Sequence, residues 1–402
     1  MQNKMTNLPQ GWEVKKLEEI ANIKGGKRLP KGKNLLDNNT KFAYIRVADF
    51  QDNGTINLQN IKFINENTYN VLKNYKIYDD NLYISIAGTI GKSGIIPKEL
   101  NGAILTENAV KLEYIQNNIS NKFMYFFTLS NIFKTQIQTS TKIVAQPKLA
   151  ITRLKQIQIP LPPLKEQERI VGILDESFAK IDESIKILEQ DLLNLDELIQ
   201  SALQKAFNPL KDNAKENYKL PQSWEWKSLE EISENISAGG DKPKNCTESK
   251  TAKNQIPVYA NGVNNNGLVG YTDKATIIKP SLTISARGTI GFVCIRKEPY
   301  FPIVRLISLI PCENILCLHY LYFCLNFFIA KGEGSSIPQL TIPKFKSLQI
   351  PLPPLKEQEQ IAEHLDFVFE KAKALKELYT KELKDYEELK QSLLNKAFKG
   401  EL

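Results

Sequence analysis

The sequence predicts an α+β protein with two globular mixed α/β domains, each followed by a long α-helix, the two helices pairing as an antiparallel coiled coil. Three observations lead to this prediction: an eleven-residue phrase that occurs twice, a heptad pattern that follows its first copy, and short β-type runs elsewhere. The length of 402 residues suits two or three domains. Identical undecapeptides within one chain indicate that a segment was duplicated.

The internal repeat is larger than this one phrase. "QIPLPPLKEQE" fills residues 158–168 and again 349–359. Three further pairs recur in the same order: "LPQGWEVKKLEEI" at 8–20 with "LPQSWEWKSLEEI" at 220–232, "ISIAGTIG" at 84–91 with "ISARGTIG" at 284–291, and "QKAF" at 204–207 with "NKAF" at 395–398. The predicted boundaries are a first globular domain at 1–160, a first long helix at 161–210, a second globular domain at 211–350 and a second long helix at 351–402.

The first long helix carries a coiled-coil seam. Its apolar residues follow one another in steps of four and three: Leu174, Phe178, Ile181, Ile185, Leu188, Leu192, Leu195 and Ile199. A helix of about 40 residues is roughly 60 Å long at 1.5 Å per residue. Asn208 and Pro209 are expected to stop this helix, and Gly400 to stop the second one.

The seam of the second helix is poorer. Lys376 and Lys390 stand where the first copy has Ile185 and Ile199. Four leucines are expected to widen the apolar stripe instead, namely Leu375, Leu378, Leu389 and Leu393. Such seams could join two molecules, but an intramolecular pair is favoured because one chain already holds both helices.

The globular regions read as mixed α/β. Runs such as "KFAYIRVADF" at 41–50 and "SLTISARGTIGFVCI" at 281–295 are typical of strands, and Asn, Gly and Asp separate them as turns require. A shorter helical stretch comes near the end of each region, at 121–137 and 317–331. The five cysteines form no paired framework, and no apolar run or leader-like segment stands out, so the chain is expected to be cytoplasmic and without a membrane partner.

Charge separates the domains from the helices. Residues 1–160 hold 22 Lys and Arg against 12 Asp and Glu, and residues 211–350 hold 17 against 12. The helical segments are acidic, with 5 against 10 in 161–210 and 9 against 11 in 351–402. This pattern predicts that the domains meet a polyanion. The segment "KGGKRLPKGK" at 24–33 adds glycines that let a backbone approach phosphate, although a solvated loop is the alternative.

Catalytic and cofactor motifs are missing from the sequence. It contains neither a P-loop nor a helix-opening G-x-G-x-x-G. The only histidines are His319 and His364, and the cysteines near His319 do not have a common zinc spacing. No catalytic residue and no metal ligand is therefore predicted.

The doubled phrases, in this order, resemble the DNA-specificity subunit of type I restriction-modification enzymes over essentially the whole chain. The resemblance implies two target recognition domains, each reading one half of a split DNA sequence. It also implies that the paired helices set the spacing and dock two modification subunits. The chain itself would be non-catalytic: S-adenosylmethionine, ATP and Mg²⁺ would be needed only by partner subunits for DNA methylation and cleavage. Whether a restriction subunit is present stays open.

Double-stranded DNA is thus the expected ligand, with Arg suited to guanine edges and Lys to phosphates. A structural ion pair is the alternative for Arg46 and Arg287. A plain surface turn is the alternative for the two segments that precede the copies of the eleven-residue phrase, "STKIVAQPKL" at 140–149 and "GSSIPQL" at 334–340. The candidate DNA-binding residues are Lys24, Lys27, Arg28, Arg46, Lys92, Lys142, Gln146 and Lys148 in the first domain, and Lys242, Lys244, Arg287, Arg305, Lys331, Ser335, Ser336 and Gln339 in the second. Two other functions are alternatives: a coiled-coil scaffold with protein-binding globular ends, and an enzyme with a cryptic nuclease site.

Overall fold

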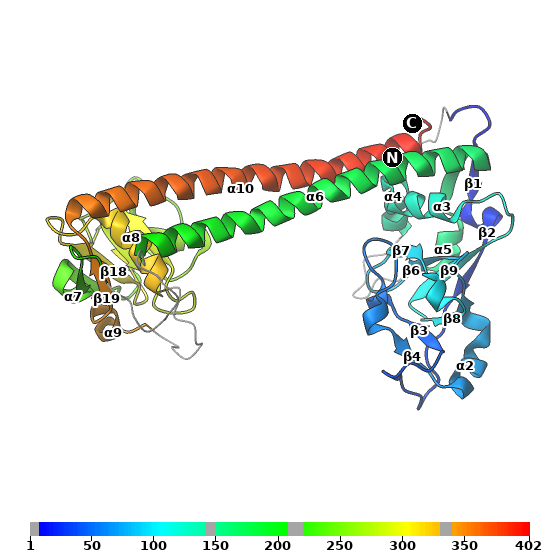
Figure 1. The fold of residues 1–402 in the computed structure, drawn as a ribbon, viewed down its shortest axis with the longest axis horizontal. Helices are drawn as coiled ribbons and strands as arrows, with labels where there is room; N and C mark the ends of the chain where they lie inside the picture. The colour runs from blue at the N-terminus through cyan, green and yellow to red at the C-terminus, as the bar shows by residue number, and fades with distance from the viewer. Residues whose placement is uncertain (1–7, 141–148, 208–219, 330–339) are drawn as a thin grey trace. The chain divides into compact units, whose positions relative to one another are not determined.

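The computed structural model describes residues 8–140, 149–207, 220–329 and 340–402. The chain divides into two compact units. Unit 1 comprises Met1–Leu188 with Lys381–Leu402, and unit 2 comprises Glu189–Thr380. Each long helix, α6 (Leu164–Phe207) and α10 (Leu355–Ala397), therefore contributes one part to each unit (Figure 1).

The globular part of unit 1 holds two four-stranded sheets, with strand orders β2-β9-β6-β7 and β4-β3-β8-β5. Helices α3 and α4 lie against the first sheet, and buried Phe123, Phe127 and Leu82 belong to one core there. The elements are β1 (Glu13–Lys16), α1 (Leu17–Ile20), β2 (Ala21–Gly25), β3 (Ala43–Ile45), β4 (Lys62–Phe63), α2 (Glu66–Leu72), β5 (Lys76–Ile77), β6 (Leu82–Ser85), β7 (Ser93–Ile95), β8 (Ala103–Leu105), β9 (Ala109–Tyr114), α3 (Asn121–Leu129), α4 (Asn131–Ser140), α5 (Ile151–Lys155) and β10 (Gln158–Leu161), with short 3₁₀ turns between them.

The globular part of unit 2 repeats this arrangement, but its second sheet has one strand fewer. A four-stranded sheet has the order β12-β18-β15-β16, and a three-stranded sheet has the order β14-β13-β17. The predicted mixed α/β architecture is thus confirmed in both units. The elements are β11 (Glu225–Ser228), α7 (Leu229–Ile232), β12 (Ser233–Ala238), β13 (Ile256–Tyr259), β14 (Leu268–Thr272), β15 (Ser281–Ile284), β16 (Val293–Arg296), β17 (Phe301–Pro302), β18 (Ile307–Pro311), α8 (Leu318–Ile329), α9 (Ile342–Lys346) and β19 (Gln349–Leu352).

The Pro-rich phrase is a strand followed by a helix start. Strand β10 pairs antiparallel with β1, and β19 pairs in the same register with β11. The prolines keep these residues extended, and the helices begin only at Leu164 and Leu355, shortly after the predicted boundaries of 161 and 351. Glu166 and Glu357 occupy the first turns, where the helix dipole favours carboxylates.

The predicted seam of α6 is confirmed. Leu174, Ile181, Leu188 and Leu195, spaced seven residues apart, are all buried, and the intervening seam residues are partly buried. Within unit 1, Asp182 of α6 pairs with Lys390 of α10. Within unit 2, Asp196 pairs with Lys376. The helices therefore lie side by side and antiparallel inside each unit, as the intramolecular prediction requires (Figure 1).

One expectation about α10 is wrong. Leu375, Leu378 and Leu389 do not widen the buried stripe, because they are exposed. The two lysines at the seam positions stay there instead, with their side chains only 32% and 16% exposed and their ammonium groups on aspartates of α6. A long lysine stem can cover an apolar seam while its charged end reaches water and a partner.

The repeated "KAF" phrase closes the core of the opposite globular part. Phe207, the last residue of α6, lies in the core of unit 2 with its ring 5.5 Å from that of Tyr320. Phe398, directly after α10, lies in the core of unit 1 with its ring 5.1 Å from that of Phe123. Each helix thus starts in one globular part and ends in the other. The chain turns at Gly400, which has a φ of 74°, as predicted for the stop of the second helix.

Candidate nucleic-acid interface

Four loops of unit 2 meet at one edge of its sheets. They follow β12, β13, β15 and β17. The Asn261 side chain joins three of the chain segments: its Nδ2 donates to the Val304 carbonyl over 2.6 Å, and its Oδ1 accepts from the Ala286 N–H over 2.8 Å. The Val304 N–H also donates to the Gly240 carbonyl over 2.8 Å. The side chain of one asparagine thus fixes loops that lie far apart in the sequence.

Four of the predicted cations of the second domain lie on these joined loops. Lys242 and Lys244 follow the Gly240 turn, Arg287 follows Ala286, and Arg305 follows Val304; all four are exposed. In the described part of the chain, Lys242, Lys244 and Arg305 have no carboxylate partner. These four candidate residues therefore lie together at one edge of the sheets, and three of them are available to bind a polyanion.

In unit 1 three of the predicted cations are already paired with carboxylates. Lys24 Nζ lies 2.5 Å from Glu113, Arg28 Nε lies 2.7 Å from Glu107, and Lys92 Nζ lies 2.7 Å from Asp52. Lys27 lies over the ring of Tyr75, 5.8 Å from its centroid. A phosphate would have to compete with these acidic groups for Lys24, Arg28 and Lys92.

Glu107 is an acidic partner whose ionised form Arg28 stabilises. Partial burial raises the pKa of its carboxyl, but the hydrogen bonds from Arg28, from its own backbone and from Thr106 outweigh burial, so the pKa lies below its ordinary value. The edge of unit 1 therefore offers mixed charge where the edge of unit 2 is basic.

Arg46 makes a structural ion pair, which is the alternative to DNA contact given for it above. Its guanidinium donates to both carboxylate oxygens of Asp49, over 3.1 and 2.6 Å, and to the Asn60 carbonyl over 3.0 Å. Asp49 is buried and also accepts from the Arg46 backbone N–H. This geometry favours a role in folding the 46–60 segment over contact with DNA.

The sequence prediction omitted Lys31 and Lys33, although both lie within its basic segment. They are exposed and have no ion pair among the residues that the structure describes. Gly26, by contrast, is explained by packing: a Cβ there would lie 2.1 Å from the Thr106 carbonyl oxygen. The glycine serves the approach of two backbone segments, whereas the prediction had assigned it to phosphate. The signal that could have pointed to Lys31 and Lys33 was two lysines that follow Pro30 with no acidic residue between them.

The two "GTIG" turns have the same backbone geometry. Gly91 and Gly291 donate to the carbonyls of Ser85 and Ser285, each over 2.9 Å, and the turn glycines have positive φ. The last residues of the segments 140–149 and 334–340 bond next to these turns: the Leu149 and Leu340 N–H groups donate to the Ile86 and Ala286 carbonyls. Candidates within the segments themselves lie outside the described residues: Lys142, Gln146, Lys148, Lys331, Ser335, Ser336 and Gln339.

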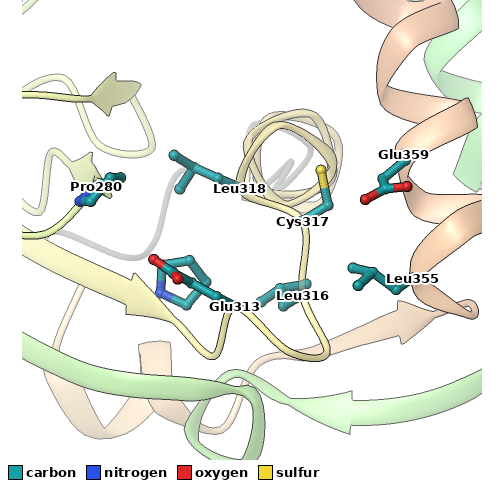
Figure 2. Close-up of a pocket in the computed structure, with 8 residues that line it drawn as sticks. Pro280, Glu313, Leu316, Cys317, Leu318, Leu355 and Glu359 are labelled. Carbon is teal, nitrogen blue, oxygen red and sulfur yellow. The ribbon is translucent and has the colours of Figure 1, made fainter.

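A shallow pocket of unit 2 is unsuited to DNA. Figure 2 shows Glu313 and Glu359 around it, from the loop before α8 and from α10, with Cys317 at the start of α8. Two carboxylates repel phosphate. His319 nearby pairs with Asp366 over 2.7 Å. Among the described residues, no group of three His, Cys, Asp or Glu side chains could hold a metal ion. None of the described helices could span a membrane.

Comparison with known proteins identifies the repeated domain. The family model of the type I restriction modification DNA specificity domain matches residues 9–192 and again residues 221–384. A putative type I specificity subunit of Mycoplasma pneumoniae is 29% identical over 357 residues, covering 87% of both chains. A putative type I restriction enzyme specificity subunit of Methanocaldococcus jannaschii is 23% identical and covers 98% of this chain and 94% of its own.

Solved structures have the same fold. The crystal structure of the HsdS subunit from Thermoanaerobacter tengcongensis superposes with a TM-score of 0.63 at 20% identity, covering all of both chains. A chain from a structure of the type I R-M system has a TM-score of 0.81 at 20% identity, covering 98% of this chain and all of its own. With a matching fold and two matches to one family model, this chain belongs to the family of type I restriction-modification DNA-specificity subunits, which supply DNA recognition and leave catalysis to other subunits.

Proposed function

We propose that the two globular parts read the two unlike halves of a split double-stranded DNA target. In this proposal the helices α6 and α10 hold the two readers at a fixed spacing. The observation that supports it most directly is that the two globular parts share the same backbone framework but carry different side chains at the edges of their sheets. The strand pairs β1–β10 and β11–β19, the "GTIG" turns and the bonds beside them recur in both copies.

The four-residue turns that enter β9 and β18 carry this difference. The turn 106–109 reads Thr-Glu-Asn-Ala, and the equivalent turn 303–306 reads Ile-Val-Arg-Leu. They are equivalent because the Thr106 and Ile303 N–H groups donate to the Ile45 and Tyr259 carbonyls, and the Ala109 and Leu306 carbonyls accept from Gly26 and Gly239. A carboxylate accepts from base amino groups, whereas a guanidinium suits the guanine edge, so unlike turns favour unlike half-sites.

We also propose that the two helices dock two modification subunits. Several large apolar side chains on the helices are exposed, and a soluble complex would cover them with partner surface. Those in unit 1 are Ile187 and Leu389, and those in unit 2 are Leu193, Leu198, Phe367, Leu375 and Leu378. In this proposal S-adenosylmethionine, ATP and Mg²⁺ serve the partner subunits alone, the assembly acts on DNA in the cytoplasm, and a restriction subunit joins it where DNA is cleaved.

Methylation mapping on native DNA tests the reading of a split target. Deleting the gene for this chain should abolish methylation at one two-part motif, and restoring the gene should restore it. Unchanged methylation after deletion contradicts the proposal.

Co-purification with the modification subunit tests the docking. Replacing Leu193, Phe367 and Leu378 together by Glu should reduce the modification subunits retained from two toward one, because the altered residues all lie in unit 2. Glu substitutions at the exposed polar positions Gln200, Lys373 and Lys381 are the matched control. Retention of both subunits by the apolar-to-Glu variant would place the docking surface elsewhere.

The scaffold alternative makes a different prediction. A protein-binding scaffold would show no steep dependence of DNA affinity on salt, whereas a DNA reader that neutralises several phosphates loses affinity steeply as salt rises. Measuring the affinity of the assembled complex for target DNA at several salt concentrations separates the two functions.

A further inference from the structure

Backbone strain in this chain is concentrated in two turns of unit 2. Of the five non-glycine residues with positive φ in the described part of the chain, four are Asn265 (47°), Asn266 (52°), Val304 (53°) and Arg305 (58°). Left-handed backbone is unfavourable for L-residues and most of all for a β-branched one such as valine. Residues in such conformations persist where the surrounding structure enforces them, and they cluster at functional sites.

Two side chains enforce these conformations. Asn261 bonds the Val304 carbonyl, as described above. Arg296 donates to the Asn266 carbonyl and, over 3.0 Å, to Thr283 Oγ1, while its guanidinium carbon lies 3.5 Å from the ring centroid of Tyr259. Arg296 is only 8% exposed and has no carboxylate partner among the described residues. An unpaired buried cation is costly, so its place beneath this loop calls for a reason beyond packing.

The turns present polar side chains that the fold leaves unused. Asn264, Asn265 and Asn266 are consecutive and exposed, and Arg305 is exposed in the adjoining turn. Within the described residues none of these four side chains has a hydrogen-bond partner. An amide offers one donor and one acceptor, which match the major-groove edge of adenine, and a guanidinium offers two donors, which match that of guanine.

We propose that Asn264–Asn266 and Arg305 are the base-reading residues of the second domain, and that Asn261 and Arg296 are positioning residues that hold them. This inference rests on the proposed function and narrows it to one edge of one unit. The equivalent turn of unit 1 differs: Glu107 there pairs with Arg28, and neither Glu107 nor Asn108 has positive φ. The two domains therefore read by different chemistry.

Glycine substitutions test the reading because glycine keeps a positive-φ backbone while removing the side chain. The variants are Asn265→Gly with Asn266→Gly, and separately Arg305→Gly. Each is combined with the modification subunits, and the methylated motif is mapped on native DNA. Val304→Gly is the matched control, since it relieves strain in the same turn without removing a polar group.

We expect the Asn variant to relax one A·T position and the Arg variant to relax one G·C position, both in the same half-site. The other half-site and the Val304→Gly motif should be unchanged. In binding to DNAs substituted at each position, discrimination at the relaxed position should fall about 10-fold or more. Motifs that stay fully stringent in both variants overturn the inference.

If a variant loses all methylation, its binding to the same substituted DNAs is measured at lower salt, where weakened complexes still bind. Discrimination lost at one position supports base reading. Affinity reduced equally for every DNA, with all discrimination retained, overturns it in favour of phosphate contact or a folding role. If the unaltered chain itself directs no two-part motif, the proposed function fails; if it does and the variants read that motif unchanged, only this inference fails.

Discussion

At the scale of single residues, one glutamine in each copy locks a globular part to its helix. Gln167 accepts from the Ser120 N–H over 2.8 Å and donates to the carbonyls of Asn118 and Pro162. Gln358 makes the same three bonds in unit 2, to Cys317, Ile315 and Pro353. Both amides are buried, so their polar atoms have no access to water. The recurrence of "KEQE" was visible in the sequence, but this function of its glutamine was not, because the partners come from loops about 40 residues away.

Replacing Gln167 by Leu should destabilise unit 1 strongly. The substitution leaves the buried Pro162 carbonyl without a partner, and also the Ser120 N–H and the Asn118 carbonyl, whose bonds are partly buried, at about 1–3 kcal/mol for a buried unsatisfied group. We expect the free energy of unfolding to fall by about 3 kcal/mol, measured by urea denaturation. Gln200→Leu, on an exposed face of α6, should change it by less than about 0.5 kcal/mol. Equal effects of the two substitutions would show that the buried bonds are not the cause.

A second residue-scale prediction concerns acid stability in unit 1. Glu113 pairs with both Lys24 and the almost fully buried Lys111, each over 2.5 Å. Partial burial raises the pKa of Glu113, but the bonds from the two lysines outweigh it, so the folded pKa lies below the ordinary value. The stabilisation is therefore complete above the unfolded pKa of about 4.3 and is lost as pH falls through the folded pKa.

Glu113→Gln should accordingly cost about 3 kcal/mol of unfolding free energy at pH 7, because Lys111 loses its carboxylate. The difference from the unaltered chain should shrink as pH falls from the unfolded pKa of about 4.3 through the folded pKa, below which Glu113 is protonated in both states. Urea denaturation across pH 3–7 measures this, with exposed Glu99→Gln as control. A difference that is constant with pH would point to packing instead of charge.

At the scale of elements, sequence periodicity predicted the long helices well and the sheets poorly. The seam residues from Leu174 to Leu195 repeat every seven positions, a pattern that one helix can express without knowing its partner. The strands are two to six residues long and pair out of sequence order, as in β2-β9-β6-β7. Such pairings depend on contacts distant in sequence, so short apolar runs do not determine them. The same holds for the site residues. The basic composition of the loops predicted which regions carry the cations. The Arg46–Asp49 ion pair and the turn at Asn264–Asn266 could be recognised only from the folded backbone.

The element-scale prediction concerns the crossed helix ends. Phe398→Ala should cost about 3–5 kcal/mol, because it removes a fully buried ring that packs against Phe123 and Phe127. Hydrogen exchange should show lost protection in the globular part of unit 1, including residues 121–129, with unit 2 unaffected. Phe367→Ala, whose ring is 60% exposed, is the control and should leave protection unchanged. Loss of protection in both units would mean that the ring stabilises more than its own core.

At the scale of the whole molecule, each repeat completes the fold of the other. Helix α6 begins beside Gln167 in unit 1 and ends at Phe207 in unit 2, and α10 makes the return from Gln358 to Phe398. Neither copy is self-sufficient, because each globular core includes a phenylalanine supplied by the other repeat. Duplication therefore produces a closed chain path with two helices in antiparallel register, whereas a single copy would leave one core open.

Helix length should then set the gap between half-sites. Moving fourteen residues along α6, from Asp182 to Asp196, moves fourteen residues back along α10, from Lys390 to Lys376. Seven residues inserted after Leu188 and seven after Leu383 therefore keep both ion pairs and the heptad seam in register. Each insertion adds about 10.5 Å of helix, close to three base pairs of duplex. Methylation mapping should show the same two half-sites separated by about three more base pairs.

Five-residue insertions at the same points are the matched control. Five residues turn a helix through about 500°, which rotates one reader against the other and moves the seam off its partner. Such a chain should direct little or no methylation, although it is shorter than the seven-residue variant. An unchanged gap in the seven-residue variant would mean that the readers are positioned by the partner subunits. A longer gap with intact half-sites assigns the spacing to the helices, because nothing in either reading edge has changed.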